Sequence, residues 1–87
     1  MDYHVVLRPA ANLALGKLPR DVQPRVIAKA QSLAVAPRPH GVKKLQGQLN
    51  LYRVAVGNYR IVYAIDDVRR LVTITIIADR KESYRAL

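Results

Sequence analysis

The spacing of apolar residues changes once along the chain, near residue 40, and this change constrains the fold more than any other feature. Between residues 9 and 36, apolar side chains recur at the intervals of three and four positions that mark helices. After residue 50 they alternate with polar residues or form short β-branched runs, as strands do. Helices followed by a run of strands predict an α+β domain, with the helices on one face of the sheet.

The first half predicts one strand and then two helices. Residues 3–7 alternate and are rich in valine, as in a strand. A first helix follows over residues 9–18, with a proline at its first position and another just after its end. Asp21 is the expected N-cap of a second helix, which Pro37 closes. The apolar stripe of that helix consists of Val22, Val26, Ile27, Ala30, Leu33 and Ala34.

The second half predicts a three-stranded meander. Gly57-Asn58 is a two-residue hairpin signal, and residues 66–70 form a polar turn. The expected strands are residues 51–56, 59–65 and 71–78. Residues 79–85 are polar and predict a short C-terminal helix or tail. The whole chain, residues 1–87, is thus expected to be one βααβββ domain, with two helices packed on a largely antiparallel, twisted sheet.

The chain is strongly basic, and its charge is spread through the predicted elements. Fifteen Lys and Arg against six Asp and Glu give a net charge of +9. Neither end carries a block of about five like charges, as a basic tail would. One face of so small a domain must be positive, which favours polyanionic partners: nucleic acid first, then an acidic protein, then an anionic membrane. A basic domain that is merely soluble is the alternative.

The composition also excludes several classes of protein. A hydrophobic content of 51% excludes a disordered chain, and no apolar run approaches the roughly 18 residues of a membrane-spanning helix. Disulfides and thiolate metal sites are excluded because the chain has no cysteine. His4 and His40 are far apart and lack a ligand motif. We therefore expect no metal, no cofactor and, without a recognisable leader, a cytoplasmic protein.

The predicted hairpin places two arginines on one face of the sheet. If Gly57-Asn58 is the whole loop, Arg53 and Arg60 become diagonal neighbours, roughly 7–8 Å apart at the backbone. Like charges this close favour a bound anion, and the small residues Ala55 and Ala64 leave room beside them. The alternative is a solvated face on which the arginine stems cover apolar atoms.

Basic and aromatic residues also follow the last predicted strand. Arg80 and Tyr84 stand at positions i and i+4, on one side of a helix. Arginine guanidinium groups bind phosphate oxygens, and tyrosine stacks on unpaired bases. Arg80 and Tyr84 together therefore fit a site for a phosphate and a base. Tyr84 as a C-terminal anchor in the core is the alternative.

Arginine residues can stabilise negative charge but are poor bases, because a guanidinium hardly deprotonates. RNA carries its own nucleophile, the 2′-hydroxyl, so an enzyme need only align it and stabilise charge on phosphorus. An RNA-cleaving enzyme built from such residues would be slow alone or would depend on a larger partner to orient the RNA.

Three segments resemble RelE-type toxins of bacterial toxin–antitoxin systems. They are Lys44-Leu45-x-Gly47, the hairpin LYRVAVGNYRIVY of residues 51–63, and the end DRKESYR of residues 79–85. The resemblance implies a ribosome-dependent mRNA endoribonuclease, or mRNA interferase. Such an enzyme cleaves message in the ribosomal A site by metal-free attack of the 2′-hydroxyl, which leaves a cyclic phosphate and stops translation.

The same resemblance implies roles for individual residues. Arg53 occupies the first basic strand site, and Arg60 contacts and stabilises the scissile phosphate. Arg80 assists the transition state or the leaving group, and Tyr84 stacks on the base or aids proton transfer. The residues implied to hold ribosomal or messenger phosphates are Lys43, Lys44, Lys81 and Arg85. The sequence departs from the family at Ala55, where a second basic residue is common, and at Asp79, where histidine is common.

The resemblance further implies a cognate antitoxin, whose complex with the toxin represses its own operon, so that operator DNA is bound only through the antitoxin. From the +9 charge we expect an acidic, partly disordered antitoxin segment that folds on the arginine face. No membrane partner is expected. Two alternatives remain. The first is a ParE-type inhibitor of DNA gyrase, although the RKxxYR end of the chain argues against it. The second is a weakly active homologue that mainly binds its antitoxin as a co-repressor.

Overall fold

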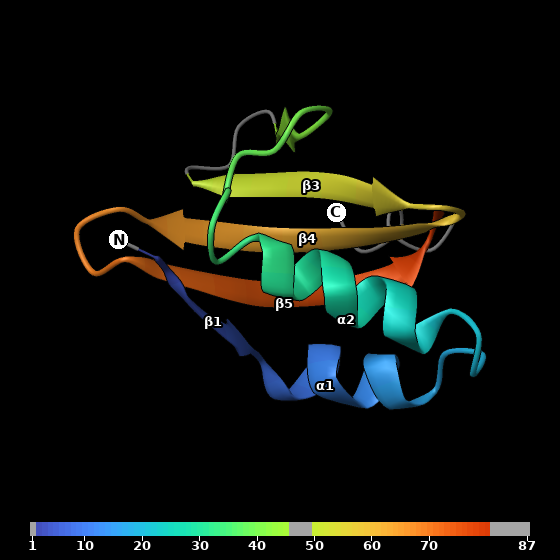
Figure 1. The fold of residues 1–87 in the computed structure, drawn as a ribbon. Coiled ribbons are helices and arrows are strands. Elements are labelled where there is room, and N and C mark those ends of the chain that lie inside the picture. The colour runs from blue at the N-terminus through green and yellow to red at the C-terminus, as the bar shows by residue number, and fades with distance from the viewer. Residues whose placement is uncertain (1, 46–49, 81–87) are drawn as a thin grey trace.

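A computed structural model describes residues 2–45 and 50–80, and in this part of the chain two helices cover one face of a five-stranded sheet (Figure 1). The elements are β1 (His4–Leu7), α1 (Pro9–Gly16), α2 (Gln23–Ser32), β2 (Lys43–Lys44), β3 (Leu51–Val56), β4 (Tyr59–Asp66) and β5 (Leu71–Asp79). The strand order is β1-β5-β4-β3-β2. β1 runs parallel to β5, and the other pairs are antiparallel. The predicted α+β class and the largely antiparallel sheet are confirmed.

The short strand β2 was not predicted. Lys43 pairs with Arg53 and Lys44 with Tyr52, which extends the sheet beyond β3. The pairing is fixed just after the strand, where the Leu45 N–H donates to the Leu51 carbonyl at 2.9 Å. Two lysines carry no hydrophobic alternation, so the strand exists because of its partner and not because of its own pattern.

The boundaries of the helices also differ from the prediction. Asp21 does not cap α2: Val22 holds the cap position, and no side chain caps that end. The turn begins earlier, at Pro19, whose carbonyl accepts the N–H groups of Val22 at 2.9 Å and Gln23 at 3.1 Å. α1 ends at Gly16 instead of residue 18. The Gln23 amide donates to the Leu18 carbonyl at 2.9 Å, which satisfies an acceptor near the end of α1.

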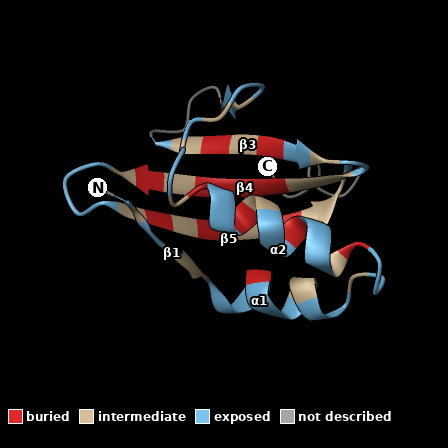
Figure 2. Cartoon of the chain, viewed as in Figure 1, coloured by how far each residue is buried: buried red, intermediate tan, exposed pale blue. Residues whose placement is uncertain are grey.

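The helices and the sheet meet in one hydrophobic core (Figure 2). From α2 and its C-terminal end, Val26 and Leu33 are fully buried and Ala30 nearly so. The sheet contributes alternate residues of its three long strands, namely Tyr52, Val54, Ile61, Tyr63, Ile65, Val72, Ile74 and Ile77. The alternation predicted for the hairpin is therefore confirmed, and the opposite sheet face is left uncovered by the helices.

A β-bulge in β5 changes which residues reach each face. Tyr63 pairs with Ile74, but Val62 pairs with Ile76, so Thr75 is the extra residue. The Thr75 hydroxyl donates to the Val62 carbonyl at 3.1 Å. Beyond the bulge, Ile77 is buried in the core. The bulge was not predicted, because uninterrupted β-branched residues show no break in period.

The loop after α2 is fastened to the turn between β4 and β5. The Arg38 guanidinium donates to the Asp67 carboxylate at 3.2 and 2.9 Å, and the Tyr3 hydroxyl donates to the same carboxylate. The guanidinium also lies over the Tyr52 ring, 5.2 Å from its centroid, and donates to its hydroxyl at 3.3 Å. Through one carboxylate, this contact joins the residue before β1, the loop after α2 and the turn between β4 and β5.

The Asp67 contact predicts a stability that depends on pH. Hydrogen bonds from Arg38 and then Tyr3 lower the pKa of Asp67 from 3.8 to about 2. Because the folded pKa is the lower one, the stabilisation is present above the unfolded value and is lost as pH falls toward about 2. Thermal unfolding of the wild type and of Asp67→Asn should differ most near neutral pH and converge near pH 2. A difference independent of pH would contradict this, and Asp21→Asn is the control.

The hairpin turn requires a glycine at its first position. Gly57 has φ +58, whereas Asn58 does not have a positive φ, the pattern of a type II′ turn. A Cβ at Gly57 would lie 2.8 Å from Nη2 of Arg25, the far end of a flexible side chain that can move aside. Backbone strain is therefore the larger cost of adding a side chain here.

We expect Gly57→Ala to lower the free energy of unfolding by about 1–2 kcal/mol, measured by urea denaturation. Asn58→Ala, in the same turn, should cost no more than about 0.5 kcal/mol. Adding Arg25→Ala to Gly57→Ala should not restore the lost stability. If it does, the clash with the guanidinium and not the strain is the cause.

Candidate nucleic-acid interface

The sheet face that the helices leave uncovered carries the predicted arginines; we call it the open face. Ala55 pairs with Arg60 and Arg53 with Val62, so the predicted register and the diagonal placement of the two arginines are confirmed. Lys43 lies directly opposite Arg53 and joins the same face. Members of the open face on β3 and β4 are Leu51, Arg53, Ala55, Arg60, Val62, Ala64 and Asp66.

The two arginines flank an apolar floor. Val62 is 1% exposed although it lies on the open face, and Arg53 and Arg60 beside it are half-buried. The floor beneath the arginines is therefore valine, and not the alanines that the sequence suggested, since Ala55 is exposed. An arginine that is partly buried binds an anion more strongly than a fully solvated one where the burial reaches its charged group, because water then screens the charge less.

The end of β5 brings a third predicted arginine to the same end of the sheet. Ala78 pairs with Arg60, and the Arg80 N–H donates to the Asn58 carbonyl at 2.8 Å. Arg80 is exposed and begins the basic C-terminal segment. The β5 bulge contributes to this placement, because it sets the register that puts Ala78 opposite Arg60.

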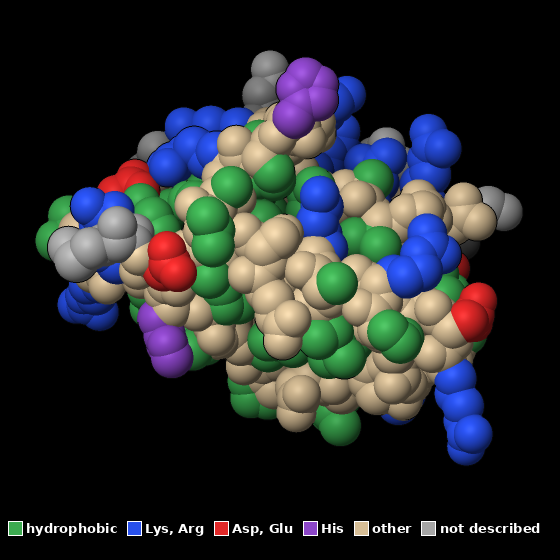
Figure 3. Space-filling model, viewed as in Figure 1, with side chains coloured by type: hydrophobic (Ala, Val, Ile, Leu, Met, Phe, Trp, Pro, Cys, Tyr) green, Lys and Arg blue, Asp and Glu red, His purple; other side chains and the backbone are tan. Residues whose placement is uncertain are grey.

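The structure separates the two predicted phosphate-binding lysines. Lys43 lies on the open face with Arg53, but Lys44 pairs with Tyr52 and so belongs to the face that packs on the helices. Both side chains are exposed at the edge of the sheet. Figure 3, seen from the helix side, shows Lys and Arg side chains gathered along the rim above α2. The predicted site residues Lys81, Tyr84 and Arg85 lie outside the described residues.

A hollow at the hairpin end could receive part of a nucleotide. Its volume is about 440 Å³, and the described residues that line it are Asn58, Tyr59, Asp79 and Arg80. Arg25 of α2 lies against Gly57 at the same turn and adds another cation nearby. Asn58, Tyr59 and Arg25 were not among the predicted site residues. Asn58 carried only a hairpin signal and Tyr59 only began a predicted strand, and nothing in the spacing of Arg25 indicated a contact with the turn.

Two further properties concern the described part of the chain. Across residues 2–45 and 50–80, side chains of His, Asp and Glu do not gather in groups of three or more that could hold a metal ion. Neither helix in these ranges has the length and apolar character needed to cross a membrane.

Comparison with known proteins shows a consistent relationship. The family model for the ParE toxin of the type II toxin–antitoxin system parDE matches residues 5–84. Toxin RelE of Mycobacterium tuberculosis is 36% identical over 88 residues, which cover 95% of this chain and 87% of that protein.

Solved structures show the same fold. The RelBE2 toxin–antitoxin complex of M. tuberculosis contains a chain with a TM-score of 0.82 and 28% identity, covering 92% of this chain and 100% of that one. The archaeal RelE–RelB complex of Pyrococcus horikoshii OT3 contains one with a TM-score of 0.81 and 28% identity, covering 92% and 97%. The chain belongs to the ParE toxin family of type II toxin–antitoxin systems, and within it to the RelE-type toxins.

Proposed function

We propose that this toxin is a ribosome-dependent mRNA endoribonuclease, which cleaves message in the ribosomal A site and so inhibits translation. One observation carries the proposal: Arg53 and Arg60 of the hairpin and Arg80 at the end of β5 are brought to the same part of the sheet. Three guanidinium groups near one place suit a phosphate whose negative charge grows during reaction. Because ribosomes are its site of action, the protein would act in the cytoplasm.

In the proposed reaction the 2′-oxygen of RNA attacks the adjacent phosphorus. A bond forms between the 2′-oxygen and phosphorus, the bond from phosphorus to the 5′-oxygen breaks, and a 2′,3′-cyclic phosphate remains. Arg60 binds the scissile phosphate, Arg53 supports it from the neighbouring strand, and Arg80 stabilises charge on the leaving oxygen. One proton must pass from the 2′-oxygen to the 5′-oxygen, and Tyr84 either aids that transfer or stacks on a base.

The same groups explain why a ribosome would be needed. Guanidinium groups stabilise charge but scarcely accept protons, so positioning must supply much of the rate. A ribosome holds the message in one geometry and brings the 2′-hydroxyl into line with the phosphate. Lys43, Lys44, Lys81 and Arg85 would contact the phosphates of ribosomal or messenger RNA.

A cognate antitoxin is the second proposed partner. The structures of related toxins from M. tuberculosis and P. horikoshii are of complexes with an antitoxin. For this chain we propose an acidic, partly disordered segment that folds over the arginine face, and a complex that represses its own operon through antitoxin-bound DNA. Salt should weaken this complex if charge dominates its affinity.

The test is to induce the toxin without antitoxin and to map the 5′ ends of messages on translating ribosomes. We expect new ends inside codons and a fall in protein synthesis. The match to the ParE toxin model favours a second candidate, inhibition of DNA gyrase. Intact messages together with DNA damage would support that candidate. Normal growth would instead support a weakly active homologue, to which the departures at Ala55 and Asp79 point.

A further inference from the structure

A side chain from the helix layer touches the turn of the β3–β4 hairpin. Arg25 of α2 reaches Gly57, where the position that a Cβ would take lies 2.8 Å from Nη2 and 3.6 Å from Cζ of the guanidinium. The guanidinium therefore occupies the space that a side chain at residue 57 would need. None of the roles proposed above for the arginines of the open face uses this contact.

Arg25 comes from a part of α2 that is fixed in the core. Val22 and Val26, on either side of it in the chain, are both buried. In Figure 1 the N-terminal end of α2 and the β3–β4 turn lie at the same end of the molecule. A guanidinium is planar and weakly hydrated, so it packs against a glycine backbone more readily than an ammonium group does. The helix thus presents a suitable group to the turn from a fixed position.

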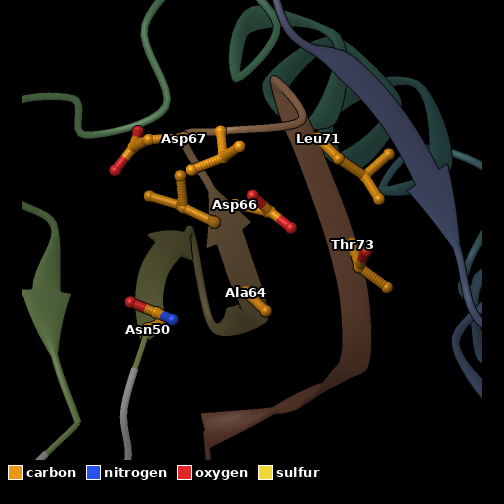
Figure 4. Close-up of a pocket in the computed structure, with 8 residues that line it drawn as sticks. Asn50, Ala64, Asp66, Asp67, Leu71 and Thr73 are labelled. Atoms are coloured by element: carbon orange, nitrogen blue, oxygen red, sulfur yellow. The ribbon is translucent and has the colours of Figure 1, made fainter.

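The turn end of β3 has few neighbours within the sheet. In the part of the chain that the structure describes, β2 pairs with the first half of β3 only, so residues 54–56 have a strand on one side, β4. At the opposite end of the hairpin, which Figure 4 shows, the Asn50 carbonyl accepts the Ile65 N–H at 3.0 Å and β2 lies alongside. Arg25 therefore contacts the hairpin at the end where the sheet itself holds β3 least.

The same turn helps to fix the position of Arg80. Asn58 follows Gly57, and its carbonyl accepts the Arg80 N–H at 2.8 Å. A two-residue turn has little internal freedom, so a shift of Gly57 moves the Asn58 carbonyl with it. The contact of Arg25 with the turn therefore affects the point from which the Arg80 side chain extends.

We propose that Arg25 is a positioning residue for the cleavage reaction. It holds the β3–β4 turn, and through the Asn58 carbonyl it keeps Arg80 where the leaving oxygen needs a positive charge. Arg25 itself need not touch RNA in this role. The inference rests on the proposed function, since it explains how one of the reacting arginines is held in place.

Hydrogen exchange of single amides tests the contact without any cleavage. The full chain is followed by NMR in heavy water as the wild type, Arg25→Ala and Arg20→Ala, and Arg20 lies in the exposed loop between the helices. We expect the Arg80 amide to exchange about five- to tenfold faster in Arg25→Ala, because the turn opens more often. The Arg8 amide, which donates to β5, should not change, and Arg20→Ala should match the wild type. Unchanged exchange at Arg80 would overturn the positioning role.

Cleavage kinetics test whether the contact serves the reaction. With ribosomes that carry a defined message, Arg25→Ala should lower kcat about five- to tenfold and leave KM within about twofold, since a misplaced group slows reaction more than binding. Arg25→Lys keeps the charge but lacks the planar guanidinium, and should lose nearly as much. A rise in KM with kcat unchanged, or full activity of Arg25→Lys, would mean that Arg25 acts by its charge on RNA and would overturn the proposal.

A double-mutant cycle with Arg80→Ala identifies the group through which Arg25 acts. Once the Arg80 side chain is removed, Arg25→Ala should cost no further activity. Equal losses with and without that side chain would overturn the role assigned to Arg25. A wild-type chain that cleaves no message, while Arg25→Ala still speeds exchange at the Arg80 amide, would instead count against the endoribonuclease proposal alone.

Discussion

Arg60→Ala should reduce message cleavage at least about 100-fold, the usual cost of removing one group that stabilises transition-state charge. Arg60 is half-buried on the open face, pairs with Ala55 and Ala78, and lies beside the buried Val62. Arg60 thus lies on the part of the sheet where the scissile phosphate is proposed to bind. The rate is measured with purified ribosomes carrying a defined message in the A site.

The matched control for Arg60→Ala is Arg20→Ala, in the exposed loop between α1 and α2. Both variants lose one positive charge, so a general weakening of ribosome binding affects both. Arg20→Ala should stay within a few-fold of the wild type, and both should unfold close to the wild-type temperature. Equal losses in the two variants would mean that Arg60 contributes only net charge and has no specific place in catalysis.

Ile74→Ala is expected to lower the free energy of unfolding by about 2–5 kcal/mol. Ile74 is completely buried in β5 and pairs with Leu7 of β1 and Tyr63 of β4. Removing most of its side chain leaves a cavity where three strands meet. The total stability of a domain is about 5–15 kcal/mol, so the loss would remove a large share of it.

Urea denaturation followed by circular dichroism measures the loss caused by Ile74→Ala. The control is Val68→Ala in the β4–β5 turn, where the side chain is 95% exposed. That change should alter stability by no more than about 0.5 kcal/mol. A loss below about 1 kcal/mol for Ile74→Ala would show that the sheet closes around the gap, and would contradict a tightly packed core.

The hairpin and its faces could be predicted from the sequence because a period of two and a two-residue turn fix the register. Arg53 and Arg60 were placed correctly by this local rule alone. Arg80 was placed only after the strands were paired, since its position depends on the contact with Asn58. The opposite placement of Lys43 and Lys44 required the pairing of β2 with β3, which puts adjacent residues of the strand on opposite faces of the sheet.

Other features depend on contacts that no local pattern records. β2 forms because Lys43 and Lys44 pair with residues of β3. The bulge at Thr75 sets the register of β5 against β4. The contact of Arg38 with Asp67 joins loops 29 positions apart in the chain. Each of these is a tertiary interaction, and each changes the sheet edge or the surface where partners would bind.

The most direct test replaces one nucleotide of the message. A ribosome-bound mRNA is prepared with a single 2′-deoxynucleotide at the mapped cleavage position and is compared with the all-ribose message. Attack by the 2′-hydroxyl predicts that the deoxy message is not cut there, and that the all-ribose product ends in a 2′,3′-cyclic phosphate. Equal cutting of both messages, or a product with a free 3′-hydroxyl, would contradict the mechanism and the roles given to the three arginines.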